Sequence, residues 1–244
     1  MSKNLVVIPT FNEKENIRDI IALTRTITPS FDILVVDDGS PDGTASIVKE
    51  EMEATPDRVF LIERKGKLGL GTAYITGFKW AVEQGYEYIC EMDADFSHDP
   101  HDLAKLQMAC EQGADVAIGS RYVTGVNVVN WPMGRVLMSY YASFYVRLIT
   151  GMPFKDTTAG FKCYRRRVFE RLNLDSIAFI GYAFQIEMKF NAWKHGFKVV
   201  EVPIIFTDRT KGLSKMTKGI FKEAIFGVLE MKIKSLFKKY EPAS

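Results

Sequence analysis

Asp93 and Asp95, two carboxylates one residue apart, follow an apolar run at residues 86–92. Such a run is typical of a buried strand, and aspartate is rare in strands, so we expect the strand to end at Asp93. Two carboxylates this close repel each other unless a positive charge lies between them. A divalent cation that carries an anionic ligand would supply that charge. The alternative is a solvated turn in which Asp99 or Asp102 caps the next helix, and this stretch alone favours neither.

Further acidic side chains follow two more of the predicted strands. Glu13 comes after the first strand, and Asp37 and Asp38 come after the second. Ligands of open α/β sheets bind at the carboxyl ends of the strands, so we expect one crevice that binds a metal ion and the hydroxyl groups of a ligand. Asp37 or Asp38 could instead cap the helix that follows.

Several cationic residues could bind phosphate groups near these acids. Arg121 ends a predicted strand, Arg135 begins a predicted helix, and Arg209 and Lys215 lie in a basic loop. Arginine grips phosphate oxygens through a planar fork, whereas lysine supplies a point charge. Any one of them could be a solvated surface residue. Taken with the carboxylates, the set indicates a diphosphate substrate and a second anion.

A glycine-rich turn and two histidines favour no other chemistry. The glycine-rich turn at residues 66–71 follows the third strand and lacks the dinucleotide spacing, so we interpret it as close backbone packing beside the crevice. Within it, Lys67 is a candidate anion contact. His98 and His101 have no third ligand at zinc spacing, which makes turn or surface roles the better interpretation.

Strands and helices alternate along the first half of the chain, and they would position these residues. We expect strands at residues 5–9, 32–36, 59–62, 86–92 and 115–119, with helices between them. This order predicts a mostly parallel sheet with helices on both faces. Beyond it we expect a loop at 125–132, helices at 133–149, 165–172 and 182–195, strands at 161–164 and 198–206, a basic loop at 207–216 and a helix at 218–239.

Composition sets the outer bounds. A chain of 244 residues with 47% hydrophobic and 25% charged residues is an ordinary globular protein of one α/β domain, with or without an appendage. Its three cysteines, odd in number and widely spaced, predict buried thiols in a reducing compartment. Neither a signal peptide nor an apolar stretch of roughly 20 residues is evident. We therefore expect a cytoplasmic protein, or one attached to a membrane from its cytoplasmic side.

Six motifs of the chain resemble those of a known enzyme family. They are PTFNE at residues 9–13, DDGS at 37–40, GLGTA at 69–73, MDADFSH at 92–98, GSRY at 119–122, and Arg209 followed by Lys215. Together they resemble the dolichol- or polyprenol-phosphate mannose synthases, which are family 2 glycosyltransferases. The resemblance runs from residue 5 to about residue 216. It implies the GT-A fold, a Rossmann-like, mostly parallel central sheet flanked by helices, here followed by a basic C-terminal helix.

The resemblance implies an inverting hexosyltransferase that moves mannose from GDP-mannose to a polyprenyl (dolichyl-type) phosphate. The acceptor phosphate is already ionised at neutral pH, so alignment of the reacting atoms and stabilisation of the leaving diphosphate would suffice without a strong base. Two alternatives stay open: a UDP-glucose or other UDP-sugar donor, and a nucleotide-sugar-binding subunit without activity. Intact Asp93 and Asp95 argue against the second alternative.

The resemblance also implies roles by position at the donor end. Asp93, Ala94 and Asp95 would contact the donor diphosphate, and Asp93 and Asp95 would bind its Mg²⁺ or Mn²⁺. Many family members have a glutamine at position 97 that can bind the metal; Ser97 would leave more of the coordination to Asp95, the substrate phosphates and water. The donor nucleoside would be held by Pro9, Phe11, Glu13, Val36 and Asp38.

The cations take the remaining roles implied by the resemblance. Arg121 and Arg135 would bind the acceptor phosphate, and Arg209 and Lys215 would close over the donor phosphates. We expect Asp93, Asp95 and Arg121 to be the catalytic residues.

We expect a catalytic domain at residues 1–216 and a basic helix and tail at residues 217–244. The chain is similar to short family members that work at a membrane surface or with small membrane-protein partners, and no nucleic acid is expected. A basic interfacial helix is attracted to anionic lipid, although its apolar side could equally pack on the domain. That side comprises Phe221, Ile225, Val228, Leu229, Ile233 and Leu236.

The predicted helix at residues 133–149 is a second candidate for contact with a prenyl chain. Its aromatic residues are Tyr140, Tyr141, Phe144 and Tyr145, and Trp131 lies just before it. Ordinary core packing is the default interpretation for such a helix.

Overall fold

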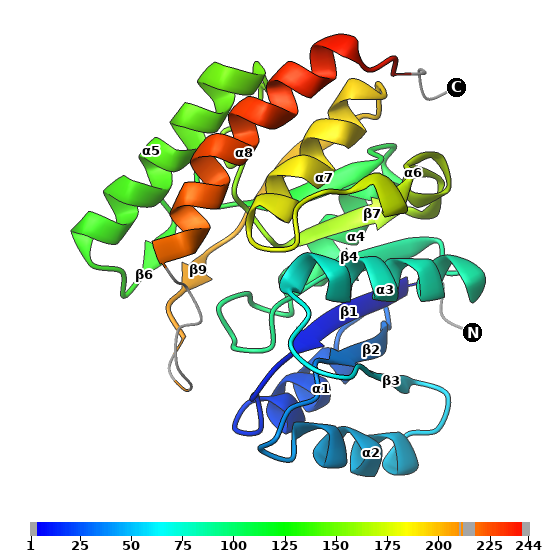
Figure 1. Ribbon diagram of the computed structural model, residues 1–244. Helices are drawn as coiled ribbons and strands as arrows, with labels where there is room; N and C mark the ends of the chain where they lie inside the picture. The colour runs from blue at the N-terminus through cyan, green and yellow to red at the C-terminus, as the bar shows by residue number, and fades with distance from the viewer. Residues whose placement is uncertain (1–3, 210, 212–217, 241–244) are drawn as a thin grey trace.

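A computed structural model describes residues 4–209, 211 and 218–240 of the chain, with side chains from 225 onward in the last segment (Figure 1). Its centre is a seven-stranded sheet in the order β3-β2-β1-β4-β7-β5-β8. Every neighbouring pair is parallel except those of β7, which runs antiparallel to both β4 and β5. The predicted mostly parallel α/β sheet is confirmed. The strands are β1 (Asn4–Thr10), β2 (Asp32–Asp37), β3 (Val59–Glu63), β4 (Tyr88–Glu91), β5 (Val116–Ser120), β7 (Lys162–Arg165) and β8 (Val199–Pro203).

Helices cover both faces of the sheet, because the strands are apolar on both sides. In β1, Val6 and Ile8 face one hydrophobic core while Leu5 and Val7 face the other. The first core is closed by α1 (Ile17–Arg25), α2 (Thr44–Ala54) and α4 (Asp102–Glu111), and the second by α3 (Leu70–Glu83), α6 (Arg166–Arg171) and α7 (Ala183–Lys194). The unbroken apolar runs of the sequence follow from this two-sided burial.

Two long helices form an outer layer beyond α7. In Figure 1, α8 (Lys218–Phe237) lies between α5 (Met133–Thr150) and α7. Val228 and Met231 of α8 are buried, as is Val146 of α5. Packing of α8 on the domain is therefore real, but it uses only one side of the helix.

The opposite sides of α5 and α8 carry exposed apolar side chains. On α5 they are Met133, Leu137, Met138, Tyr140, Tyr141, Phe144 and Leu148. On α8 they are Ile225, Phe226, Leu229, Ile233, Leu236 and Phe237. The default interpretation of the α5 aromatics as ordinary core is wrong for Tyr140, Tyr141 and Phe144, because α8 covers a different side of the helix. In the described part of the chain, no helix combines the length and the apolar character needed to cross a bilayer.

The connection after β8 differs from the prediction. The expected strand at 198–206 stops at Pro203, and a separate strand β9 (Phe206–Thr207) pairs with β6 (Val128–Val129) in the segment expected to be a loop. Proline has no N–H to continue the ladder, so the chain leaves the sheet there. Thr207 N then donates to Ser97 O over 3.2 Å, which carries the next residues across the turn after β4.

Candidate active site

The carboxyl end of β4 delivers Asp93 and Asp95 into a tight turn. Phe96 has a φ of 60°, and Ser97 N donates to Asp95 Oδ1 over 3.1 Å. Asp93 Oδ1 accepts a hydrogen bond from the Tyr74 hydroxyl over 3.3 Å, and Asp93 N donates to His98 Nδ1 over 3.3 Å. Both carboxylates are thus held in place by neighbours, which a freely solvated turn would not do.

Arg209 brings a positive charge to this pair. It follows β9, and its Nη2 lies 2.9 Å from Asp95 Oδ2. Burial raises the pKa of Asp93, and the negative charge of Asp95 raises it further. Burial acts on Asp95 in the same sense, but the hydrogen bonds from Ser97 and the charge of Arg209 outweigh it and keep the pKa of Asp95 below its usual range. The two carboxylates therefore compete for positive charge, as expected of a cation site.

The donor set fits a divalent ion that arrives with a substrate. Within residues 4–209, 211 and 218–240, no cluster of three or more His, Cys, Asp or Glu side chains is suited to hold a metal by itself. Magnesium is commonly bound by one or two carboxylates together with substrate phosphates and water. Asp93 and Asp95 match that pattern. The His98 ring stacks on Phe161 at 4.8 Å, and burial lowers the pKa of His98, so the ring is neutral at pH 7.

The predicted nucleoside-binding residues lie along the ends of β1 and β2. Phe11 is half-buried, with Lys67 Nζ 5.1 Å from its ring centroid, and Pro9 is half-buried in β1. Glu13 is buried and accepts a hydrogen bond from Asn16 Nδ2 over 3.0 Å. The side chain of Val36 is fully buried in the hydrophobic core, so only its main chain is left for a ligand.

Asp37 and Asp38 have different tasks. Asp37 accepts hydrogen bonds from Thr10 Oγ1 over 2.7 Å and from Ser40 N over 2.8 Å, which makes it the organiser of its own turn. Asp38 is paired with Arg64, whose Nε lies 2.6 Å from Asp38 Oδ1. Sequence reasoning missed Arg64, since a single arginine after a strand has no signature of its own.

The glycine-rich turn packs as the sequence predicted. Gly69 has a φ of 105°, and a Cβ there would lie 2.9 Å from Ile180 O. A Cβ on Gly71 would lie 2.7 Å from Phe179 O. The loop before α7 therefore sits directly on this turn, and side chains would push the two apart.

Arg121 stands at the other end of the site, one residue beyond β5. Its Nε and Nη2 donate to the two oxygens of Asp156 over 2.7 and 2.6 Å, and Nη2 also reaches Thr158 Oγ1 over 2.8 Å. Both charged groups are buried. Burial opposes the charge of Asp156, yet Arg121 holds the pKa of Asp156 below its usual range. Sequence reasoning missed Asp156, although its neighbours Thr157 and Thr158 mark a polar stretch in an apolar region.

Arg135 lies beside Arg121 on an aromatic support. Its guanidinium carbon is 4.2 Å from the Trp131 ring centroid, and its Nη1 is 2.7 Å from Asp208 Oδ1. Because Asp208 precedes Arg209, the same short segment links Arg135 to the carboxylate turn.

One pocket joins the two ends of the site. Five predicted residues line it: Asp93, Ser97, Arg121, Arg135 and Arg209. Asp95, which pairs with Arg209, and Ala94 are buried and are not part of the pocket lining. The predicted nucleoside-binding residues also lie outside this pocket, along β1 and β2: Pro9, Phe11, Glu13, Val36 and Asp38. Lys215 lies outside the described residues. Trp131, a candidate for prenyl-chain contact, lines the pocket as well, and lining residues that the sequence did not single out include Met138, Thr158, Tyr182, Gln185 and Phe206.

A buried charge network supports the pocket from below. Lys162 Nζ lies 3.1 Å from Glu91 Oε1, and Gln185 Nε2 donates to Glu91 Oε2 over 2.7 Å. Lys162 also donates to Gln185 Oε1, which closes the network. These three residues come from β7, β4 and α7, so the network ties the pocket wall to the strand that carries Asp93.

Comparison with known proteins agrees with this geometry. The sequence is 47% identical over 232 residues to a polyprenol monophosphomannose synthase of Mycolicibacterium smegmatis, which covers 95% of this chain and 88% of the relative. It is 43% identical over 224 residues to an undecaprenyl-phosphate mannosyltransferase of Micrococcus luteus, which covers 92% of this chain and 91% of the relative.

Solved structures show the same fold at low identity. A glucosyl-3-phosphoglycerate synthase from Mycobacterium tuberculosis, in complex with Mn²⁺, UDP and glucosyl-3-phosphoglycerate, matches with a TM-score of 0.66 and 16% identity over 98% of this chain and 81% of that one. A mannosyltransferase from Pyrobaculum calidifontis in complex with GDP-mannose and Mn²⁺ matches with a TM-score of 0.61 and 18% identity over 98% of this chain and 66% of that one.

The family model of the glycosyl transferases covers the strands that deliver the carboxylates and Arg121, while Arg209 and α7 lie beyond it. It matches residues 5–172, from β1 through β7 to the end of α6, and includes Asp93, Asp95, Arg121 and Arg135. The chain therefore belongs to glycosyl transferase family 2.

Proposed function

We propose that this chain is an inverting glycosyltransferase that moves mannose from GDP-mannose to a polyprenyl phosphate, forming a β-linked polyprenyl-phosphate mannose and GDP. One observation carries the proposal: a single pocket is lined by Asp93 and Arg209, beside Asp95, and by Arg121 and Arg135, beside the Trp131 ring. That arrangement suits two phosphate-bearing substrates that meet in one cavity. The two bacterial relatives named for the synthesis or transfer of polyprenyl-linked mannose support the choice of substrates.

The pocket favours an acceptor that needs no deprotonation. Among the described residues that line it, Asp93 is the only carboxylate. Burial lowers the pKa of His98 to about 4, and its Nδ1 already accepts from Asp93 N, so it is a poor general base. A phosphate oxygen is ionised at neutral pH and can attack the anomeric carbon directly. Attack from the face opposite the leaving diphosphate inverts the anomeric centre.

The donor end would neutralise the departing diphosphate. Asp93 and Asp95 would hold Mg²⁺ or Mn²⁺, which would offset the negative charge that develops on the leaving group. Arg209 is placed to move from Asp95 to a donor phosphate, with Lys215 following it in sequence. The nucleoside would lie along Pro9, Phe11, Glu13, Asp38 and the main chain of Val36. Both solved structures of the same fold are complexes with Mn²⁺ and a nucleotide or nucleotide sugar.

The acceptor end would lead to a membrane. Met138 of α5 lines the pocket and also belongs to the exposed apolar side of α5 and α8. A prenyl chain could leave the pocket along this side without crossing polar surface. Lys234 lies in the last turn of α8, Lys238 and Lys239 follow the helix, and the three would attract anionic headgroups. We place the enzyme at the cytoplasmic face because its three cysteines are buried free thiols.

The deciding experiment offers the protein labelled GDP-mannose or UDP-glucose with a polyprenyl phosphate and Mg²⁺. Labelled lipid from GDP-mannose, lost when Mg²⁺ is chelated, is the expected result. Labelled lipid formed only from UDP-glucose would show that the transferred sugar is glucose and not mannose. Labelled lipid from neither donor would remove the enzymatic assignment.

A further inference from the structure

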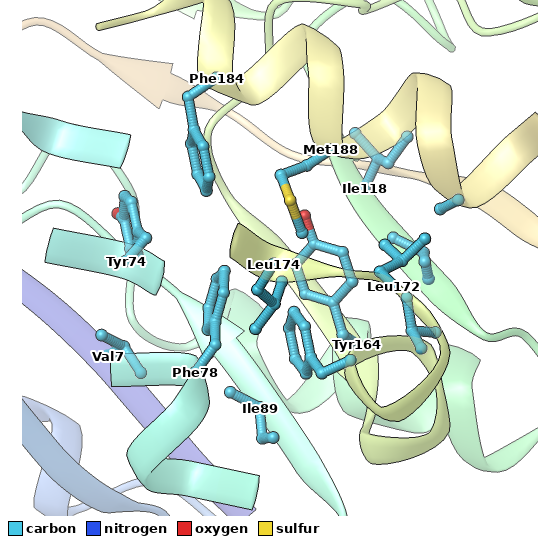
Figure 2. Close-up of a cluster of buried hydrophobic side chains, with 14 of the residues drawn as sticks. Val7, Tyr74, Phe78, Ile89, Ile118, Tyr164, Leu172, Leu174, Phe184 and Met188 are labelled. Atoms are coloured by element: carbon cyan, nitrogen blue, oxygen red, sulfur yellow. The ribbon is translucent and has the colours of Figure 1, made fainter. Parts of the chain in front are cut away.

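Tyr74 of α3 contacts one of the two carboxylates from inside the protein. Its hydroxyl donates to Asp93 Oδ1 over 3.3 Å, while the rest of the side chain is fully buried. Figure 2 shows Tyr74 projecting from α3 in the same cluster as Phe78 and Phe184. Neither the motifs nor the family resemblance assigns this residue a role.

The ring of Tyr74 has no freedom to turn. It stacks on Phe184 with ring centroids 6.0 Å apart and an interplanar angle of 4°, and on Phe78 at 5.8 Å and 22°. A closely packed aromatic ring stays in one rotamer because any other would open a void or a clash. The hydroxyl is therefore presented at one fixed point.

The height of α3 above the sheet is fixed as well. Gly77 lies so close to β1 that a Cβ there would be 2.5 Å from Val7 Cγ1. At the start of the helix, a Cβ on Gly71 would be 2.9 Å from Phe184 Cβ. Close packing at Gly71 and Gly77, on either side of Tyr74, holds α3 in one position on the sheet. The position of the Tyr74 hydroxyl is therefore set by the fold and not by the ligand.

We propose that Tyr74 is a positioning residue for the metal site: its hydroxyl occupies Asp93 Oδ1 and leaves Asp93 Oδ2 to bind the divalent ion. Partners of metal ligands orient the ligand, and their loss typically costs about 10- to 100-fold in metal affinity or activity. The inference rests on the proposed function, in which Asp93 and Asp95 hold an ion together with the donor diphosphate.

The test is the affinity for Mn²⁺ in the presence of GDP, measured from the paramagnetic resonance signal of free Mn²⁺. Tyr74→Phe keeps the ring and removes the hydroxyl, so its dissociation constant for Mn²⁺ should rise about tenfold. The matched control is Tyr164→Phe. Tyr164 is equally buried in the same core cluster, and the carboxylate that acts on its hydroxyl is Glu91, not Asp93 or Asp95. This control should bind Mn²⁺ as the unmodified protein does.

Transfer kinetics give a second reading. Saturating Mn²⁺ should return most of the kcat of Tyr74→Phe while its KM for Mn²⁺ stays high, a split that a general loss of packing would not produce. Equal Mn²⁺ affinity in Tyr74→Phe and the unmodified protein would overturn the inference. So would a Tyr74→Phe variant that fails to fold while Tyr164→Phe folds, because the hydroxyl would then serve the core.

Failure of the metal site and failure of the role of Tyr74 would give different results. If the unmodified protein binds no Mn²⁺ with GDP, the proposed metal site itself fails. A further comparison needs no metal: Asp93→Ala leaves the buried hydroxyl of Tyr74 without its acceptor, and adding Tyr74→Phe should then raise the midpoint of thermal unfolding. No recovery in the double variant would count against the contact.

Discussion

At the scale of single residues, the site is a set of charges that restrain one another. Asp95 is held by Arg209, and Asp156 is held by Arg121, in both cases with the carboxylate buried. A buried carboxylate is stable only beside a cation or several donors. The two pairs differ in exposure. The Arg121 side chain is 10% exposed and donates to both oxygens of Asp156, whereas the Arg209 side chain is 21% exposed beside the pocket, where another cation can replace it.

Replacing Asp95 tests the exchangeable pair. Asp95→Asn removes the charge that a divalent ion needs, so transfer from GDP-mannose should fall by about a hundredfold or more. Asp99→Asn is the control, because Asp99 is an exposed aspartate of the same turn that pairs with His101. Initial rates at saturating donor would measure both. Unchanged transfer in Asp95→Asn would show that Asp95 is not needed for metal chemistry.

Replacing Asp156 tests the fixed pair. Asp156→Asn leaves the buried guanidinium of Arg121 without its counter-charge, which should lower the free energy of unfolding by about 3 kcal/mol at pH 7. Urea denaturation would measure this change. A loss close to zero would mean that Arg121 finds other partners at no cost.

The same pair makes a prediction about pH. Since Arg121 lowers the pKa of Asp156 in the folded protein, the pair stabilises the fold above the unfolded pKa of about 3.9. That stability is lost as the pH falls through the lower pKa of the folded state. When the pH is lowered from about 4 to about 2, the free energy of unfolding of the unmodified protein should therefore fall by more than that of Asp156→Asn.

At the scale of elements, α3 is the part that connects core packing to the site. It carries Tyr74 toward Asp93 on one turn and rests Gly77 on Val7 one turn later. The close approach of α3 to β1 depends on the absence of a side chain at Gly77, because a Cβ there would collide with Val7. Small changes in the position of α3 on the sheet should therefore displace Tyr74 and, with it, Asp93.

A pair of glycine variants tests this packing. Gly77→Ala places a methyl group 2.5 Å from Val7 Cγ1 and should lower the thermal midpoint, because α3 or β1 must shift. Gly134→Ala in α5 is the control. Among the residues that the structure describes, no atom outside its own helix segment lies within 4 Å of a Cβ there, so the variant should gain the usual helix preference of alanine. A Gly77→Ala variant as stable as Gly134→Ala would show that the packing is loose.

Much of this arrangement could be predicted from the sequence. Unbroken apolar runs identified β1, β2 and β5, and the acids that follow β1, β2 and β4 were expected at one edge because parallel strands end together. The order of strands in the sheet could not be predicted, since nothing local says that β7 enters antiparallel between β4 and β5. Partners distant in the chain, such as Asp156 for Arg121, were missed for the same reason.

The short strands β6 and β9 were beyond prediction too. Two residues carry no periodic pattern, and β9 forms because the chain leaves β8 at Pro203 and meets Val128 and Val129. Their pairing nevertheless matters, because it aims Arg209 at Asp95. The sequence identified Arg209 as a cation of the site without showing what holds it there.

At the scale of the whole molecule, polar chemistry and apolar surface meet at one place. The outer layer of α5 and α8 is exposed on the side away from α7, and Met138 takes part in both that surface and the pocket. Exposed apolar side chains gathered over two helices are uncommon on a protein that stays in water. A membrane would cover them and would also hold the prenyl chain of the acceptor.

Charge placed on this surface should weaken membrane binding. We expect the double variant Phe226→Asp and Leu236→Asp to lose most of its co-sedimentation with vesicles that contain phosphatidylglycerol, because two buried carboxylates would oppose insertion and repel the lipid. Met108→Asp, an exposed apolar residue of α4 on the other face of the sheet, should sediment as before. Equal binding by all three proteins would return α8 to a packing role.

The antiparallel strand β7 sets a dimension of the site. Neighbouring strands lie about 4.8 Å apart, so one strand inserted between β4 and β5 separates their edges by about 10 Å. Asp93 and Asp95 stand beyond β4, and Arg121 stands beyond β5. Without the inserted strand, Arg121 and the turn of Asp93 and Asp95 would follow directly neighbouring strands, and the pocket that Arg121 and Asp93 both line would be narrower. β7 thus works as a spacer between the two groups of opposite charge.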